Sequence, residues 1–281
     1  AAETQKRKRC LDDKKEEATT RQQLDDCSSF DDVVCAIRKA KNIIVLCGAG
    51  ISTSSGIPDF RSKNGIYEIV EEMGLPLDDP QLLFDLEFFT DDPSPFYQFA
   101  HKLYPKGISP SPTHHFLARL EKEKKLRRVF TQNIDGLEEV AGISKSKVVY
   151  CHGKLNTVTC TGKCRKQYPS SEIQNQIEQK LVPCCTCGGV LKPDVTFFGE
   201  PLHKHVKKSI NQDRDVADLL LVIGTSLKVK PMSDLVSFFN PLVPQVLLNL
   251  TPVTPLKSLT QGFDVSLIGP SDLITRHLLI A

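Results

Sequence analysis

The chain has 281 residues, with 36 basic side chains, 34 acidic ones and ten cysteines. This length can bury a sizeable core in one large domain or two, and the near balance of charge excludes a polyelectrolyte. No apolar run is long enough to span a bilayer, and the opening segment AAETQKRKRC lacks the apolar stretch of a signal peptide. We therefore expect an intracellular, reducing compartment and no membrane partner, with the cysteines present as thiols or metal ligands.

Residues 1–29 are polar and charged without usable periodicity, which indicates a tail or a helix that rests on the body. Within them, residues 6–9 (KRKR) form a compact basic cluster. Such a cluster is either part of a solvated tail or a nuclear import signal.

From residue 30 onward, apolar runs of strand length alternate with polar loops and amphipathic stretches. Ser28 or Ser29 can cap a first helix, because two aspartates follow in its first turn. Asp79 and the proline after it predict another helix start. The expected strands cover 43–47, 126–131, 147–151, 218–223, 245–248 and 263–268; the expected helices lie at about 30–40, 80–89, 95–104, 113–125 and 137–141, and from about 271. This rhythm predicts an α/β fold with a doubly wound parallel sheet.

The strand at 43–47 reads as one that is buried on both faces of a parallel sheet. It ends in Gly48-Ala49-Gly50, a turn typical of sites that cradle a dinucleotide phosphate. Thr53 stands where the dehydrogenase fingerprint G-x-G-x-x-G has its third glycine, which disfavours hydride transfer. A polar Ser/Thr stretch and a PDFR turn at 58–61 follow instead.

Six expected strands end in small or polar residues: GAG, QNID, HG, GTS, N and G. In open α/β sheets, ligands bind at the carboxyl ends of the strands. The shared pattern therefore predicts a cofactor crevice at this edge of the sheet.

Cys160 and Cys164 are followed, after 19 residues, by Cys184 and Cys187. Two close thiol pairs suit a tetrahedral zinc, and four protein ligands leave no open position, so the metal would be structural. Cys185 could replace Cys184, but the two-residue gap of Cys184 suits a zinc knuckle better. The module is basic like a nucleic-acid ribbon, but it lacks interleaved aromatics, so we expect no sequence-specific nucleic-acid partner.

The segments GAGISTSSGIPDFR, TQNIDGLE, CHG, LKPDVTFFGE and GTSLKVKP, together with the four cysteines, resemble those of the sirtuins, the NAD-dependent protein deacylases. The resemblance covers about residues 30–280. DPQLLFDLEFF and PSPFYQFAHKLYP are most similar to the nuclear and cytosolic deacetylase branch.

This resemblance implies a Rossmann-like part made of 30–61, 105–153 and 195–281. It also implies a smaller part made of a helical insertion (62–104) and a zinc module (154–194). NAD and the acyl-lysine peptide would meet in the cleft between the two parts.

By resemblance, His152 is the general base that takes a proton from the ribose hydroxyls, and Asn133 holds a water or the ribose near the reacting carbon. The pKa of an imidazole lies near the working pH, which suits this task. The other six histidines have no such setting, and we expect them on the surface, including His114, His115, His203 and His205.

The resemblance also assigns the NAD contacts. Asp135 would accept from the nicotinamide carboxamide, Phe60 would shield the ribose, and Arg61 would direct positive charge to phosphate. Asp59 and Asp135 could instead merely cap helices. The full expected set is Gly48, Ala49, Gly50, Ser52, Asp59, Phe60, Arg61, Tyr67, Gln132, Asn133, Ile134, Asp135, His152, Gly224, Thr225, Ser226, Asn249, Leu250 and Ser271.

The substrate peptide would pair as an added strand between two short segments. The expected contacts are Val195, Phe197, Phe198, Gly199, Leu227 and Val229. Relatives that remove acidic acyl groups place a Tyr and an Arg in the second insertion helix, where this chain has Ala100 and Leu103. Without a cation there, a buried carboxylate would lack a partner, so we expect a neutral acyl group.

The expected function is NAD-dependent deacetylation of protein lysines, with the acetyl group transferred to ADP-ribose and nicotinamide released. Acetylated nuclear proteins such as histones would be the substrates, in the nucleus or the cytoplasm. Two alternatives stay open: a protein mono-ADP-ribosyltransferase, and a chromatin-silencing scaffold that binds NAD. The sequence predicts no oligomeric state.

Overall fold

The computed structural model describes residues 21–24, 27–104, 107–229, 232–253 and 262–280. The basic cluster at 6–9 lies outside the described residues. None of the described helices is both long enough and apolar enough to cross a bilayer.

Six parallel strands form the main sheet, in the order β3-β2-β1-β7-β8-β9. Their bounds are β1 Ile43–Cys47, β2 Leu126–Thr131, β3 Val148–Tyr150, β7 Leu219–Ile223, β8 Gln245–Asn249 and β9 Val265–Ile268. The doubly wound parallel sheet expected from the sequence is confirmed. Strand order reverses beside β1, and open α/β sheets bind ligands at such a switch point.

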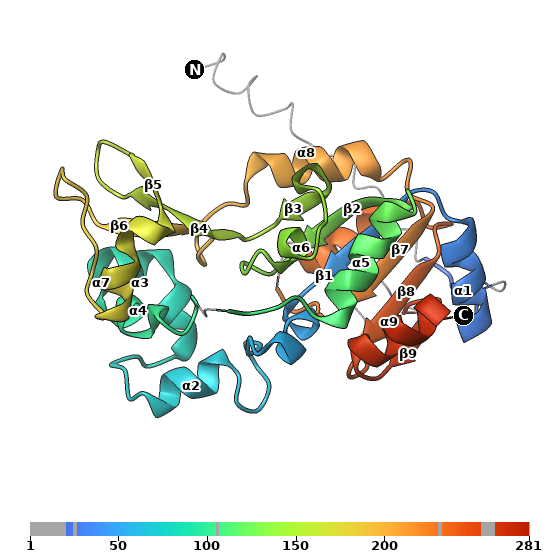
Figure 1. Cartoon of the computed structure of the whole chain (residues 1–281), viewed down its shortest axis with the longest axis horizontal. Coiled ribbons are helices and arrows are strands. Elements are labelled where there is room, and N and C mark those ends of the chain that lie inside the picture. Colours follow the sequence, from blue (N-terminus) through green and yellow to red (C-terminus); the bar gives the residue numbers. More distant parts are fainter. Residues whose placement is uncertain (1–20, 25–26, 105–106, 230–231, 254–261, 281) are drawn as a thin grey trace, which may run out of the picture.

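Helices cover both faces of this sheet (Figure 1). On one face lie α1 (Phe30–Lys39), α5 (Pro112–Lys122) and α9 (Ser271–Ile280), whose apolar side chains share a core with the sheet. On the other face lie α8 (Lys204–Asp213) and the 3-10 helix Met232–Phe238. Helix α1 begins where expected, because Ser29 accepts a hydrogen bond from the Asp32 N–H and the Asp32 carboxylate accepts one in return.

A second apolar cluster joins the helical insertion to the cysteine module, on the left of Figure 1. Its helices are α2 (Ile66–Glu72), α3 (Leu86–Asp91), α4 (Ser94–Ala100) and α7 (Gln174–Glu178), and its antiparallel strands are β4 (Gly153–Cys160), β5 (Gln167–Pro169) and β6 (Leu191–Val195). Edge-to-face rings fill it: Phe89 lies 5.5 Å from Phe96 and 5.3 Å from Phe197 between ring centroids. Two segments distant in sequence therefore share one core. The domain boundaries stay a prediction.

Some elements differ from the sequence-based expectation. The expected helix at 80–89 is two elements, a 3-10 helix (Pro80–Phe84) capped by Asp79 and then α3, capped by Asp85. Each aspartate carboxylate accepts a hydrogen bond from a backbone N–H in the first turn that follows it, so a new helix begins after the second aspartate. Helices α2 and α8 were not predicted. The remaining short elements are α6 (Leu137–Val140) and the 3-10 segments Ala49–Ile51, Thr53–Ser55, Lys145–Lys147 and Ser170–Ile173.

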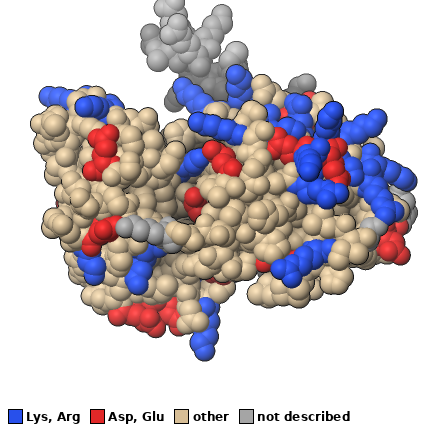
Figure 2. Space-filling view, in the orientation of Figure 1, with Lys and Arg blue, Asp and Glu red and all other residues tan. Residues whose placement is uncertain are grey.

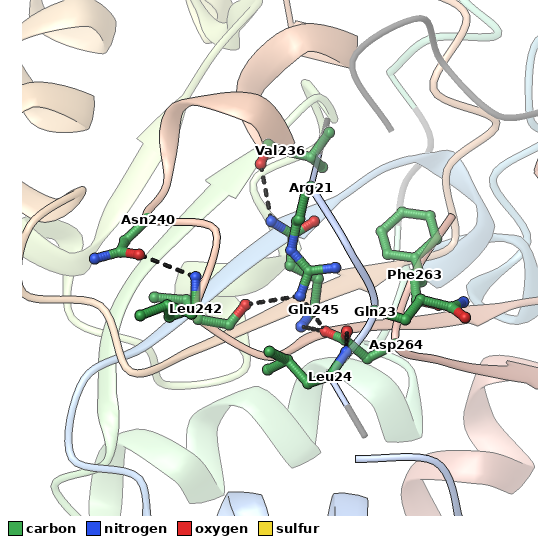
Figure 3. Close-up of polar contacts among 10 residues, drawn as sticks. Arg21, Gln23, Leu24, Val236, Asn240, Leu242, Gln245, Phe263 and Asp264 are labelled. Atoms are coloured by element: carbon green, nitrogen blue, oxygen red, sulfur yellow. Dashed lines mark hydrogen bonds and ion pairs between the residues drawn. The ribbon is translucent and has the colours of Figure 1, made fainter. Parts of the chain in front are cut away.

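The segment 21–24 docks on the sheet through a buried carboxylate (Figure 3). Asp264 receives the Arg21 guanidinium, the Leu24 N–H at 2.8 Å and the Gln245 N–H at 2.6 Å. The Asp264 side chain is fully enclosed and Arg21 is only 6% exposed. One acidic group therefore fastens the described N-terminal segment to β8 and to the start of β9.

We predict that Asp264→Asn lowers the free energy of unfolding by about 3–5 kcal/mol, because the isosteric amide leaves the buried Arg21 charge without a counter-charge. Urea unfolding followed by circular dichroism measures the change. Asp215→Asn is the control, since this side chain is 80% exposed and its ion pair with Arg214 spans 3.6 Å; we expect a change within about 0.5 kcal/mol. Equal midpoints for Asp264→Asn and wild type would contradict the assigned role.

Candidate functional site

A cleft of about 850 Å³ lies at the carboxyl ends of the main strands and is closed on its other side by the smaller apolar unit. Residues that follow β1, β2, β7, β8 and β9 line one wall, and Phe84 and the segment 195–202 line the other. This volume is in the range of sites that hold a cofactor. The crevice predicted from the strand ends is therefore present.

Two glycine turns meet at the bottom of the cleft. The Gly50 N–H donates to the Gly224 carbonyl at 2.8 Å. A Cβ atom on Gly50 would lie 2.8 Å from the Gly224 Cα, and one on Gly224, whose φ is +60°, would lie 2.7 Å from the Ile51 nitrogen. Only glycine fits at both positions. We call Gly48, Gly50 and Gly224 the glycine floor.

The chain after this floor explains the missing third glycine. Thr53 begins a short 3-10 helix rather than a long α-helix packed against the strand. The PDFR turn follows, held by Asp59, which accepts from the N–H groups of Arg61 at 2.8 Å and Ser62 at 2.7 Å. Burial alone would raise the pKa of Asp59, but the hydrogen bonds from Ser62 and Arg61 outweigh it, so this pKa is lowered. Asp59 thus acts as the turn cap that the sequence left open, while also lining the cleft.

Aromatic side chains from the insertion fix the position of Phe60 in the cleft. Its ring centroid lies 5.9 Å from that of Tyr67 and 5.7 Å from that of Phe84, both edge to face. The Arg61 guanidinium lies 5.6 Å from the Tyr67 ring centroid. One apolar wall and one cation therefore stand beside the glycine floor.

His152 follows β3 and lines the cleft. Its Nδ1 lies 3.1 Å from the Gln132 carbonyl oxygen, which can only accept, so Nδ1 carries the hydrogen and Nε2 has the free lone pair. Burial lowers the pKa of His152 more than its hydrogen bond to the Gln132 carbonyl raises it. Gly153, the next residue, has a φ of +77°, and a Cβ atom there would lie 2.0 Å from the backbone carbonyl oxygen of Asp194. Only glycine therefore fits in the turn after the histidine. The site thus presents a neutral base.

The residues after β2 join this base to the glycine floor. Asn133 donates from Nδ2 to the Gly48 carbonyl at 3.2 Å and to Ser52 Oγ at 3.1 Å. Both amide hydrogens are used within the wall, so Oδ1 is the atom that Asn133 can offer to a ligand. Gln132 donates to Thr225 Oγ1 at 3.2 Å and so bridges the ends of β2 and β7.

Most of the predicted site residues line this cleft, and three do not. Ser52 is 1% exposed and Leu227 2%, so both lie within the wall. Asp135 also stays behind the lining, because its carboxylate accepts from Ser52 Oγ at 2.8 Å and from the Leu137 N–H at 2.9 Å. The sequence did not identify some lining residues, namely Thr53, Ser54, Ser62, Phe84, Thr196, Glu200, Pro201, Leu202, Thr251 and Asp272. Most of them adjoin recognised motifs; Phe84 could have been found only from the aromatic clustering in the insertion.

The expectation of a surface position is wrong for His114, which is fully buried. It is the third residue of α5, where its Nδ1 lies 3.2 Å from the donating Ser111 N–H in a capping box. His114 caps α5 on the inner face of this helix, so its ring is enclosed by the core. The pattern of charged residues in this helix did not indicate that the histidine faces inward. His115, His203 and His205 are exposed, as expected.

The segment 195–199 is held from two sides. Phe198 exchanges backbone hydrogen bonds with the insertion, donating to the Phe84 carbonyl at 2.8 Å and accepting from the Leu86 N–H at 3.0 Å. Glu200 accepts from the Phe197 N–H at 2.7 Å and from Lys192 Nζ at 2.9 Å. This part of the cleft wall therefore has a fixed backbone.

Four thiols converge in the cysteine module, and Cys184 is not among them. The Sγ atoms of Cys160, Cys164, Cys185 and Cys187 lie within 4.8 Å of one another. The Cys185 N–H donates to the Gly189 carbonyl at 2.7 Å, and this turn points Cys185 inward. Cys184 instead forms an isolated antiparallel bridge with Val190. The expected ligand Cys184 is therefore corrected to Cys185, and the four converging sulfurs fit a tetrahedral zinc.

We predict that Cys185→Ser loses bound zinc and unfolds in part, whereas Cys184→Ser keeps one zinc per chain. The adjacent positions make a matched pair that differs only in whether the thiol points into the cluster. Metal analysis by mass spectrometry, with thermal unfolding beside it, gives the readout. Retention of zinc in Cys185→Ser together with its loss in Cys184→Ser would reverse the assignment.

Comparison with known proteins identifies the family. The Sir2 family model matches residues 48–231. The chain is 41% identical over 268 residues to the NAD-dependent protein deacetylase sirtuin-1 of Homo sapiens, covering 93% of this chain and 35% of that protein. It is 41% identical over 287 residues to the NAD-dependent histone deacetylase sirtuin-1 of Drosophila melanogaster (93% and 34%) and 40% identical over 290 residues to the NAD-dependent histone deacetylase SIR2 of Candida glabrata (90% and 55%). The chain thus spans between a third and just over half the length of these curated relatives, and it belongs to the Sir2 family.

Proposed function

We propose that this chain is an NAD-dependent protein-lysine deacetylase that transfers the acetyl group to ADP-ribose and releases nicotinamide. The observation that carries the proposal is the shared cleft: a neutral base, His152, stands in the same cavity as the glycine floor. The relatives named above are deacetylases that depend on NAD. A chromatin scaffold that only binds NAD would not need this base.

NAD, when bound, supplies a positively charged nicotinamide that leaves easily from the ribose. The chain's own residues position the reactants and exclude water. The glycine floor would let the diphosphate lie directly against the backbone, because no side chain projects there, and Arg61 would add a positive charge. Asn133 Oδ1 would orient the ribose of bound NAD and Phe60 would shield it, while His152 Nε2, with its free lone pair, would accept the proton of a ribose hydroxyl.

The acyl group is neutral in this proposal. Among the described residues that line the cleft, Arg61 is the one Lys or Arg, and it lies over Tyr67 beside the glycine floor. Val195, Phe197 and Phe198 give the peptide side of the cleft an apolar surface. A buried acidic acyl group would have no cation there, which disfavours it strongly.

We further propose acetylated nuclear proteins such as histones as substrates, since two of the relatives are named histone deacetylases. On the face of the molecule drawn in Figure 2, Lys and Arg are mixed with Asp and Glu rather than gathered in one basic stripe. This distribution of charge supports a protein substrate over a nucleic acid. One structural zinc on Cys160, Cys164, Cys185 and Cys187 would stabilise the module beside the insertion.

We predict that the wild-type chain releases nicotinamide from NAD when an acetyl-lysine peptide is present, and that His152→Ala lowers this rate by roughly 10²–10⁴-fold. His115→Ala, an exposed change on α5, is the control and keeps the wild-type rate. Liquid chromatography of nicotinamide and deacetylated peptide measures both. Deacetylation without NAD, or full activity of His152→Ala, would refute the proposal; ADP-ribose attached to protein would favour the transferase alternative.

The rate should rise with pH along an acidic limb. Because burial lowers the pKa of His152 below its usual 6.5, the neutral base is lost only as the pH falls through this lowered value. We predict a limb midpoint below 6.5 in the pH profile of kcat/KM for NAD, measured on enzyme that stays folded over the range. A midpoint above 6.5 would show that another group, or a stabilised imidazolium, controls the reaction.

A further inference from the structure

Behind the cleft wall lies a buried cluster that the proposed mechanism does not use: His114 of α5, Asp135 and Glu138. One ring nitrogen and one carboxylate oxygen from each acid lie within 4.8 Å of one another. His114 and Glu138 are fully buried. His114 Nε2 and both Glu138 carboxylate oxygens have no hydrogen-bond partner among the described residues. Unpaired polar atoms at this depth are costly, so the cluster requires an explanation.

The tautomer of His114 follows from the helix cap. The Ser111 N–H donates to Nδ1 at 3.2 Å, so Nδ1 is the acceptor and Nε2 carries the hydrogen of the neutral ring. Burial lowers the pKa of His114 to about 4, although Asp272 opposes this shift. His114 is therefore a neutral donor toward the acid pair and supplies no positive charge.

The two carboxyl groups cannot both be ionised here. Glu138 is surrounded by groups from several elements. They are Cys47 from β1, Thr131 from β2, Tyr150 at the end of β3, Cys151 just after β3, Asp135 and His114, with one cation, Lys154 from β4. Burial keeps the thiols and the phenol neutral by raising the pKa of each. Lys154 is already paired with Glu139 at 2.7 Å. Like charges at this distance in a low dielectric force one acid to keep its proton.

Hydrogen bonds decide which acid keeps it. Burial raises the pKa of Asp135 too, but Asp135 accepts from the Leu137 N–H at 2.9 Å and from Ser52 Oγ at 2.8 Å, and both bonds oppose this rise and favour its ionised form. Neither carboxylate oxygen of Glu138 has a hydrogen-bond partner in the described part of the chain, and the donors around it, the Thr131 hydroxyl and its own backbone N–H, lower its pKa by less than burial and Asp135 raise it. Burial, and then the charge of Asp135, raise the pKa of Glu138 to about 7.

The cluster also connects to the reaction site. The single hydrogen of Ser52 Oγ goes to Asp135, so Ser52 must accept from Asn133 Nδ2, at 3.1 Å. This acceptance fixes the amide of Asn133 with Oδ1 as the atom left for a ligand. The charge of Asp135 therefore sets the orientation of a residue in the cleft.

We propose that Glu138 and His114 are positioning residues, in which a proton held on Glu138 and the neutral His114 ring beside the two acids keep Asp135 ionised, and Asp135 orients Asn133 through Ser52. The catalytic part of this inference rests on the proposed function. The protonation part does not, and it is tested without any activity measurement.

Infrared spectroscopy of the full wild-type chain with its zinc tests the proton directly. We expect the band of a protonated carboxyl group at about pH 6, lost as the pH rises past neutrality and absent in Glu138→Gln. If Glu138→Gln does not fold, the wild-type titration still decides. Absence of the band at about pH 6, or a second bound metal beyond one zinc per chain, would overturn the proposal, since a cation would then hold the acids together.

Thermal unfolding as a function of pH gives a second test. The raised pKa of Glu138 stabilises the folded chain at low pH, and this contribution is lost as the pH rises from the unfolded value toward about 7. Glu138→Gln, always neutral, should therefore gain in melting temperature relative to wild type between about pH 5 and pH 8. Glu139→Gln is the matched control, because burial raises the pKa of Glu139 but its contacts with Lys154 and Tyr150 together lower it below 4.5; this side chain is then ionised in both states, and its difference from wild type should stay constant over the same pH range. A flat difference for Glu138→Gln would contradict the proposal.

Kinetics separate positioning from packing. We expect Glu138→Gln to keep kcat within about threefold of wild type, and folded Glu138→Ala to lose about tenfold or more in kcat with little change in KM for NAD. Equal loss in both variants, or none in either, would reject the positioning role. An inactive wild-type chain would refute the proposed function while the infrared and thermal results stand.

Discussion

The close contact between Gly50 and Gly224 is the constraint on which the rest of the site depends. It joins the ends of β1 and β7, the two strands between which the chain order of the sheet reverses. Side chains are excluded from both positions, so the backbone itself forms the bottom of the cleft. The turns that follow are then free to carry polar groups, and both walls of the crevice are built outward from this contact.

One wall is a hydrogen-bonded polar layer and the other is aromatic. Hydrogen bonds run from the glycine floor through Asn133 and Ser52 to the carboxylate of Asp135. His152 is oriented by its hydrogen bond to the Gln132 carbonyl at the end of β2. Opposite them, Phe84 of the insertion ties down the segment 195–199 through backbone hydrogen bonds. Fixed dipoles on one side and an apolar surface on the other suit a reaction that must orient a charged leaving group and exclude water.

Much of this could be predicted from the sequence, since local patterns determine it. The strand at 43–47 was found with its observed bounds because a buried parallel strand is a continuous apolar run. The cleft residues were found because their motifs are long. The inward turn of Cys185 depends on a hydrogen bond to Gly189, and the depth of His114 depends on how α5 packs. Both depend on tertiary structure, so neither the spacing of the cysteines nor the absence of a motif around His114 could predict them.

The coupling of NAD cleavage to deacetylation can be measured by quantitative mass spectrometry of all products of one reaction. His152, the glycine floor and the segment 195–199 line one cleft, so under the proposed function the cleavage of NAD and the removal of the acyl group should be a single coupled event. For an NAD-dependent deacetylase we expect equal amounts of nicotinamide and deacetylated lysine, with the acetyl group recovered on ADP-ribose. Free acetate formed in the absence of nicotinamide would contradict it.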